Sequence, residues 1–387
     1  MSNKVKTRLE MSQLLDERMN KTYTSLAEKQ ELEPDTSLVK TYLEEAHLPE
    51  TASSEQVFKL TRMVFDNEAV KRKFSARIRQ TEEEYFFLVE ASFKKEPITL
   101  YLDATNPRFW VLHSMNSSGA LDSMLNGLIA TTPLLDKAWI PTHLLLAMTK
   151  FGQFRGLGLD YDRRDLPDVD FDTDLNSVQF LKMQLWGNKA SEVLGILSGE
   201  GAFPNETTLA KVSIKHRLNG NGHGGFSIDD IKFDGKITAR GTSFQSHIDV
   251  VQKIYTDYKD LVGRVEREFQ LRSVTGQDLT ILGEPVNIVF QRPIADLTIF
   301  CDHLFNSSDP FRLWGVPVFR GENYVSVSAV DLHVGTRLDF EITNEIMRVY
   351  LPEGGCGNSI VRLYTNLQHT YDSLITAENG DGRSIFE

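Results

Sequence analysis

The chain has 387 residues and a formal net charge of −12, and 41% of its residues are hydrophobic. This composition excludes a wholly disordered protein, and the length is sufficient for two or three domains. The two cysteines exclude a disulfide framework and are typical of a reducing compartment. Residues 1–15 lack the apolar core of a secretory signal, and the most apolar stretch, residues 124–148, is interrupted by Asp136, Lys137 and two prolines. The sequence therefore predicts a soluble cytoplasmic protein that does not enter a membrane.

Residues 1–80 are predicted to form a helical N-terminal region. A first helix places its leucines on one side, and a short second helix follows over residues 38–46. Ser53 and Gln56 have the spacing of a capping box, which predicts a third helix whose last turns reach Arg79. These last turns are basic, and such cations either complement the helix dipole or form an anion-binding patch. The candidate anion-binding residues are Lys71, Arg72 and Lys73.

Residues 81–200 are predicted to form an α+β domain, because segments with strand-like alternation are interspersed with helical ones. The expected strands cover residues 85–93, 98–103, 109–113 and 154–159. The expected helices cover residues 119–130, 143–150 and 178–197.

Residues 201–273 combine a basic β-hairpin with a long helix. Apolar and basic residues alternate over 211–217, and Asp234-Gly235 is a tight-turn sequence between strands at 231–234 and 236–240. If these strands pair, one face carries Lys211, Lys215, Arg217, Lys232, Lys236 and Arg240. This face is either a solvated surface that deters edge-to-edge aggregation, or a binding site for nucleic acid or an acidic protein segment.

The helix predicted over residues 244–269 has a narrow apolar seam with heptad spacing. The seam comprises Phe244, Ile248, Val251, Tyr255, Tyr258, Val262, Val265 and Phe269. Thr242 and Ser243 are suitable N-caps. We expect the seam to cover the chain's own sheet, because β-branched and aromatic residues suit packing of a helix on a sheet. The alternative is that the seam binds a partner helix.

Residues 284–387 are predicted to form a C-terminal α+β domain after a loop at 274–283. The expected strands cover residues 286–290, 311–319, 324–334, 337–342 and 347–351, and the expected helices cover 294–305 and 360–374. Strands followed by a helix occur in this order three times, without enough similarity to indicate a sequence repeat. The predicted fold class is α+β, with a helical N-terminal region followed by antiparallel β-meander/helix units whose sheets have one face covered by long helices.

Two features resemble ligand-binding loops. Gly220, Gly222 and Gly225 have dinucleotide-loop spacing, but a strand is expected after them where the motif needs a helix, so a hairpin loop is the better interpretation. The acidic loop 160–174 could ligate Mg²⁺ or Ca²⁺, although it lacks the glycine turn and final glutamate of an EF-hand. Its candidate metal ligands are Asp168, Asp170 and Asp172. The alternatives are a solvated loop and a loop that docks on a basic surface.

The two cysteines are weak catalytic candidates. Cys356 precedes the last predicted helix, whose N-terminus favours a thiolate, but the sequence places neither His333 nor His369 beside it as a base. Cys301 and His303 are too close in sequence to form a tetrahedral zinc site. No cofactor is expected.

The predicted function is that of a non-enzymatic binding or scaffold component of a cytoplasmic multi-protein assembly, with a protein partner. The first alternative is a nucleic-acid-binding protein that uses the basic hairpin face at 211–240, with Phe226, Trp314 and Phe319 as stacking residues where they are not buried. The second alternative is a metal-dependent hydrolase that uses the acidic loop 160–174.

Overall fold

The computed structural model describes residues 5–66, 68–72, 74–93, 95–163, 178, 180–187, 189–197, 199, 204–218, 224–275 and 279–386. The helices are α1 (Arg8–Glu28), α2 (Ser54–Phe65), α3 (Glu68–Lys71), α4 (Ser118–Thr131), α5 (Thr142–Met148), α6 (Ala190–Leu197), α7 (Phe244–Phe269), α8 (Leu297–Leu304) and α9 (Gly357–Thr370), with a 3₁₀ turn at Pro204–Glu206. The strands are β1 (Val39–Ala46), β2 (Ser75–Gln80), β3 (Phe86–Phe93), β4 (Glu96–Asp103), β5 (Phe109–Ser114), β6 (Leu135–Lys137), β7 (Gln153–Asp162), β8 (Phe180–Trp186), β9 (Leu209–Arg217), β10 (Phe226–Lys232), β11 (Lys236–Gly241), β12 (Gln270–Thr275), β13 (Leu279–Leu282), β14 (Val286–Val289), β15 (Leu313–Gly321), β16 (Tyr324–Asp331), β17 (Arg337–Ile342), β18 (Ile346–Pro352) and β19 (Thr376–Glu378). Pairing is mainly antiparallel, so the predicted α+β class is confirmed.

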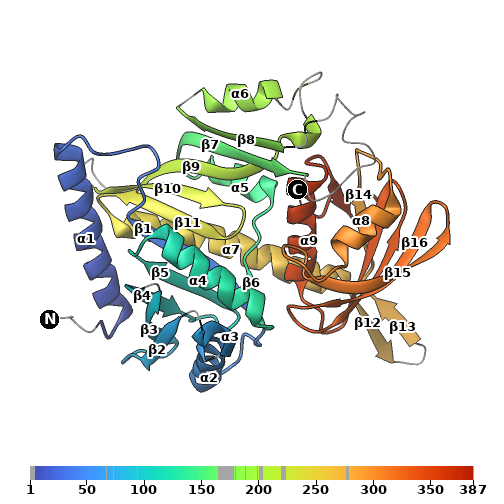
Figure 1. Cartoon of the computed structure of the whole chain (residues 1–387), viewed down its shortest axis with the longest axis horizontal. Helices are drawn as coiled ribbons and strands as arrows, with labels where there is room; N and C mark the ends of the chain where they lie inside the picture. Colours follow the sequence, from blue (N-terminus) through green and yellow to red (C-terminus); the bar gives the residue numbers. More distant parts are fainter. Residues whose placement is uncertain are drawn as a thin grey trace. The chain divides into compact units, whose positions relative to one another are not determined.

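Two compact units make up the chain (Figure 1). Unit 1 contains Met1–Ala138, Met148–Phe154 and Ser213–Thr256, and unit 2 contains Trp139–Ala147, Arg155–Val212 and Asp257–Glu387. The strand β9 and the helix α7 therefore contribute residues to both units. Among the described residues, no helix is both long and apolar enough to cross a membrane.

Unit 1 is built on a sheet with the strand order β2-β3-β4-β5-β1-β11-β10-β9. Successive side chains of a strand point to opposite faces, so the apolar run of β3 supplies two cores. Phe87 and Val89 pack in a core with residues of α2 and α4, whereas Phe86 and Leu88 pack with residues of α1. These strands are therefore covered on both faces.

The helix predicted over residues 38–46 is wrong, because Val39–Ala46 forms β1 inside this sheet. Thr41 pairs with His113 of β5, and Val39 pairs with Ala239 of β11. Every residue of β1 is buried. Pairing on both sides outweighs the local helix preference of the Leu-Glu-Glu-Ala sequence, and no local pattern could reveal these partners.

Three other sequence predictions are also wrong in part. The capping box at Ser53 is confirmed, but the helix that it begins, α2, ends at Phe65 and does not reach Arg79. Ser75–Gln80 forms the strand β2 instead. The predicted helix at 178–197 is reduced to α6, because the strand β8 precedes it. The predicted loop at 274–283 contains the end of β12 and the whole of β13, which pair as a hairpin. In each case the pairing partner lies at a distance or across a turn that the sequence pattern does not identify.

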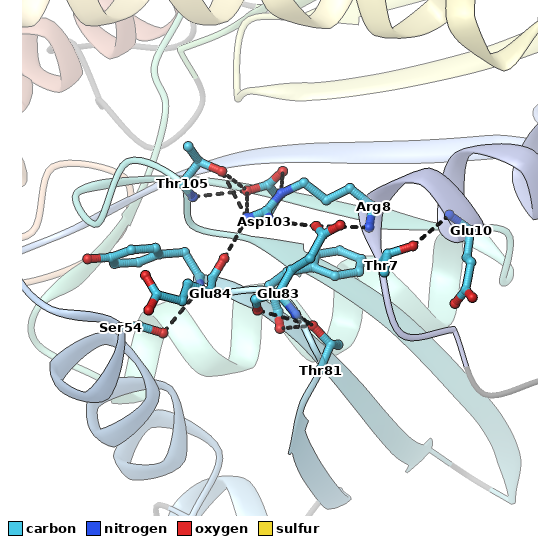
Figure 2. Close-up of polar contacts among 11 residues, drawn as sticks. Thr7, Arg8, Glu10, Ser54, Thr81, Glu83, Glu84, Asp103 and Thr105 are labelled. Atoms are coloured by element: carbon cyan, nitrogen blue, oxygen red, sulfur yellow. Dashed lines mark hydrogen bonds and ion pairs between the residues drawn. The ribbon is translucent and has the colours of Figure 1, made fainter.

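Arg8, at the start of α1, forms ion pairs with Asp103 at the end of β4 and with Glu83 (Figure 2). Its guanidinium donates to Asp103 at 2.7 and 2.9 Å and to Glu83 at 2.8 Å. The Thr105 hydroxyl also donates to Asp103, at 2.7 Å. Burial acts to raise the pKa of Asp103, but the hydrogen bonds from Arg8 and Thr105 outweigh burial and lower that pKa. The position of α1 in unit 1 is therefore set by an ion-pair network as well as by its apolar face.

Unit 2 contains a second sheet with the strand order β13-β12-β18-β17-β16-β15. Every second residue of β16, β17 and β18 is buried, so one face of these strands forms part of a core. The helix α9 is buried from Gly357 to His369, although much of it is polar. Glu266 accepts the Gly357 N–H at 2.8 Å and so caps this helix.

Candidate functional site

The strand β15 forms one edge of the unit 2 sheet and carries an exposed apolar row. Trp314, Val316 and Val318 are 55%, 66% and 43% exposed. Strand residues two apart share a face, so these side chains form one strip, which we name the β15 row. Single hydrophobic residues on a surface are common, but a contiguous apolar strip is typical of an interaction site.

The backbone edge of β15 is poorly suited to pairing with another strand. The Gly315 N–H donates to the carbonyl of Phe305 at 3.3 Å, and so it is not available to an added strand. Pro317, two residues further along β15, would direct its backbone nitrogen to the same outer edge, but proline has no N–H. Proline at such a position is one way in which sheets resist edge-to-edge association. A partner of this edge would therefore meet the side chains of the β15 row.

Polar residues border the β15 row on the same face of the sheet. Ser328 lies opposite Val316, and Ser326 lies opposite Val318, in the register of β15 and β16. The Ser328 hydroxyl donates to Asp339 of β17 at 2.6 Å. An apolar strip with a polar border has the arrangement of a small protein interface, in which a dry centre is surrounded by a wet rim.

Ion pairs within the chain neutralise the charges of this border. Arg337 and Asp339 lie 2.8 Å apart, and Arg348 and Glu341 lie 3.3 Å apart. The Tyr350 hydroxyl donates to Glu341 at 2.8 Å, and this hydrogen bond is the largest of the effects that lower the pKa of Glu341. These four charges already have partners, whereas Arg320 near the end of β15 is exposed and forms no ion pair with a described residue.

The hairpin of β12 and β13, at the other edge of the sheet, carries exposed apolar residues on both of its faces: Val274 and Leu282 share one face, and Ile281 lies on the other. Val274, Ile281 and Leu282 are 47%, 68% and 47% exposed. Of the described residues of this hairpin, Gln270 and Leu271 pair with β18. A two-stranded hairpin without further support is marginally stable in water. The hairpin is therefore a second surface that contact with a partner would stabilise.

A chain of hydrogen bonds, the Thr41 network, is buried in unit 1. Thr41 Oγ1 lies 2.8 Å from His113 Nδ1 and 2.7 Å from His247 Nε2, and His247 Nδ1 lies 2.6 Å from Asp229 Oδ1. With neutral imidazoles, His113 donates to Thr41, the Thr41 hydroxyl donates to His247, and His247 donates to Asp229. The order of groups resembles a catalytic triad, but all four residues are buried and Thr41 already binds both rings. We therefore interpret the network as structural.

Comparison with known proteins identifies the family of the chain. A family model described as "MJECL33-like protein" matches residues 1–386. The chain belongs to this family. The uncharacterized protein MJECL33 of Methanocaldococcus jannaschii is 27% identical over 406 residues, which cover 95% of this chain and 93% of the relative. Both units of this MJECL33-like protein therefore lie within the matched region.

The predicted basic hairpin face is divided between different environments in this MJECL33-like protein. The pairing of β10 with β11 at the Asp234-Gly235 turn is confirmed, and its register places Lys232, Lys236 and Arg240 on one face. Lys236 is buried and forms an ion pair with Asp122 at 2.7 Å. Of the other candidate cations, Lys211 is buried, Lys215, Lys232 and Arg240 are half-buried, and Arg217 is exposed. Nucleic-acid binding by this face stays a prediction, with fewer exposed cations than the sequence indicated.

The apolar seam of the predicted long helix lies mostly inside the chain. The helix α7 has the predicted bounds, and Ser243 acts as its N-cap by accepting the Ser246 N–H at 3.2 Å. Of the candidate partner-helix seam, Phe244, Val251, Tyr258 and Val262 are buried, while Ile248 and Tyr255 are half-buried. Further buried residues widen the stripe: His247, Val250, Ile254 and Leu261. A wide stripe is typical of a helix that covers a core, and it leaves little apolar surface for a partner helix.

Other candidate residues are either paired at the surface or not described. Lys71 is exposed and lies 3.8 Å from Asp66 and 3.7 Å from Glu68, and Arg72 is exposed nearby. Lys73, like the candidate metal ligands Asp168, Asp170 and Asp172, lies outside the described residues. The anion-binding patch and the metal site stay predictions.

The structure brings Cys356 close to a histidine that the sequence could not place. A ring nitrogen of His333 lies within 4.8 Å of Cys356 Sγ, and both residues are buried. A nucleophilic thiol needs access to its substrate, which neither residue has in this conformation. Cys301 is also buried, and burial raises its pKa to about 12, the opposite of what a reactive thiol requires.

The β15 row and the Thr41 network were not among the sequence candidates. Pro317 inside the predicted strand at 311–319 was an available signal for an edge strand. The sequence indicates Trp314 only as a stacking residue for nucleic acid if it is not buried. No sequence spacing could indicate the Thr41 network, because its members come from four separate elements.

Proposed function

We propose that this protein is a non-enzymatic binding component of a cytoplasmic multi-protein assembly and that the β15 row is its main docking surface. The observation that carries the proposal is the exposure of Trp314, Val316 and Val318 in one strip. Tryptophan is enriched among the residues that contribute most of the binding energy at protein interfaces. The sequence has two cysteines, a content that is typical of a reducing compartment.

The chemistry of the surface favours an apolar partner surface over nucleic acid. Nucleic acid requires several cations that can neutralise phosphates, whereas Arg337 and Arg348 beside the β15 row are paired within the chain, which leaves Arg320 as an exposed cation there. The Gly315 N–H already donates to Phe305, and Pro317 has no N–H, so this edge offers few donors to an added strand. The partner therefore packs its own apolar side chains across the β15 row. The apolar face of a helix or of a sheet on the partner fits this description.

The first experiment compares the partners of the wild type with those of a row variant. Replacing Trp314, Val316 and Val318 together by serine is expected to weaken partner binding by at least about tenfold, since a central tryptophan alone often contributes about 2 kcal/mol or more. Tagged proteins are recovered from the native host with and without nuclease, and the bound partner is then purified and titrated against each variant.

Matched controls separate the β15 row from general exposure of hydrophobic residues. A variant with Leu9→Ser and Met63→Ser, which changes two exposed residues of unit 1, is expected to keep the partner. Size-exclusion chromatography with light scattering on the protein alone reports self-association. Equal partner binding by the wild type and the row variant would exclude the proposal, and partners that are lost on nuclease treatment would favour the nucleic-acid alternative.

A further inference from the structure

A cavity of about 520 Å³ lies in unit 1 between α1 and one face of β3 and β4. Its volume is within the range of sites that bind small organic molecules. Leu14 and Leu15 of α1, Leu88 of β3 and Met115 supply apolar walls. The cavity is therefore built within one unit, from a helix and the sheet that the helix covers.

Three polar side chains of the cavity wall have groups available to a ligand. Tyr101 is only 7% exposed, and within the described part of the chain its hydroxyl has no hydrogen-bond partner. Thr99 adds a second hydroxyl from the same strand. Arg18 of α1 is an exposed residue that also lines the cavity at its solvent side, and no described residue forms an ion pair with it. The Tyr101 hydroxyl is not among the described polar atoms that are both buried and without a partner, so it keeps accessible surface and can be reached from the cavity.

Of the charged residues in the described lining of the cavity, Arg18 is positive and Glu90 is negative. Glu90 lines the same cavity, but it is ion-paired with Arg79 of the neighbouring strand β2. Burial raises the pKa of Tyr101, and the nearby Arg18 opposes this effect. The tyrosine is therefore a neutral donor at physiological pH, and Arg18 is the group that an anion would meet.

The helical wall is held in place without a ligand. Arg8 fixes the start of α1 to Asp103 and Glu83, as Figure 2 shows. Further along the helix, Asp16 accepts the Phe244 N–H at 2.6 Å and so connects α1 to the start of α7. A preorganised wall reduces the entropy that binding would otherwise cost.

We propose that this cavity binds a small monocarboxylate with an apolar body, with the carboxylate placed between Arg18 and the hydroxyls of Tyr101 and Thr99. A guanidinium and a hydroxyl are the donors that a carboxylate requires, and the leucines and Met115 suit an aliphatic or aromatic body. With Glu90 ion-paired to Arg79, Arg18 supplies one net positive charge, which matches a monocarboxylate better than a dianion such as a phosphate monoester.

Calorimetric titration of the full chain with octanoate, 1-octanol and octyl phosphate tests this proposal. Octanoate is expected to bind saturably and at least about tenfold more tightly than 1-octanol, because hydrogen bonds to a charged group contribute more than neutral ones. Across butyrate, hexanoate and octanoate, affinity is expected to rise by about fourfold for each added CH₂ that is fully buried. Octyl phosphate is expected to bind more weakly than octanoate.

Variants of the polar end connect the binding to this cavity. Arg18→Gln and Tyr101→Phe are each expected to weaken octanoate binding by about tenfold while leaving 1-octanol binding unchanged. Lys21→Gln removes an exposed cation from the next turn of α1 and is expected to bind octanoate like the wild type. Unchanged melting temperatures establish that the variants are folded. Absence of saturable octanoate binding, equal binding of octanoate and 1-octanol, or insensitivity to both Arg18→Gln and Tyr101→Phe would each overturn the proposal.

Discussion

Replacing Asp331 by alanine is expected to lower the free energy of unfolding by about 3–5 kcal/mol, because the substitution removes a buried carboxylate that pairs with the buried guanidinium of Arg362. Arg362 Nη2 lies 2.6 Å from Asp331 Oδ1, and both side chains are buried in unit 2. Asp331 also accepts the His333 N–H at 2.9 Å and the Ser359 hydroxyl. Burial acts to raise the pKa of Asp331, but the attraction of Arg362 and His333 and the hydrogen bonds from Ser359 and the His333 N–H together outweigh burial, and that pKa is lowered.

Urea unfolding of the wild type and variants measures this loss, and the chain provides a matched control. Arg337 and Asp339 form an ion pair of similar length, 2.8 Å, but their side chains are 68% and 45% exposed. Asp339→Ala is expected to cost less than about 1 kcal/mol, since water screens an exposed pair. The double replacement Asp331→Leu with Arg362→Met is expected to recover part of the stability lost in Asp331→Ala. A cost for Asp331→Ala no larger than that for Asp339→Ala would contradict the assigned role of the buried pair.

Local sequence signals were sufficient for elements whose periodicity and termini agree. The helix α7 has the bounds predicted from its apolar spacing and from the capping residue Ser243. The strands β16, β17 and β18 alternate cleanly, because one of their faces is buried and the other is not. In these elements the environment of each residue follows from its position within the element.

The sequence was insufficient wherever the environment depends on a distant segment. The residues of β1 become a central strand only because β5 and β11 pair on its two sides. Trp314 lies in a predicted strand, but it is exposed because, among the described residues, no helix or strand covers that face of β15. The members of the Thr41 network lie up to 206 positions apart, so no spacing rule could assemble them. The functional candidates of this protein are of this second kind.

Acid is expected to destabilise unit 1 through His113. Burial, assisted by the neighbouring His247, lowers the pKa of His113 to about 3 from the ordinary value of 6.5. Between these pH values the unfolded chain binds a proton that the folded chain does not, so stability is retained above pH 6.5 and decreases as the pH falls towards 3. The slope from this residue is about 1.4 kcal/mol for each pH unit, or on the order of 3 kcal/mol by pH 4.

Two variants distinguish proton uptake from the loss of hydrogen bonds. His113→Gln keeps a donor near Thr41 but cannot be protonated. Between pH 4 and 6.5, the decrease in its free energy of unfolding per pH unit is therefore expected to be smaller than that of the wild type by about 1.4 kcal/mol, the contribution of one proton. Thr41→Val removes two hydrogen bonds and leaves His113 buried, so it is expected to lower stability at every pH while the slope persists. Carboxylates contribute equally to the pH dependence of the wild type and of each variant. The difference between their slopes, measured by urea unfolding at several pH values, therefore gives the contribution of the His113 imidazole. The same slope in His113→Gln and in the wild type would show that His113 is not the group that carries this acid sensitivity.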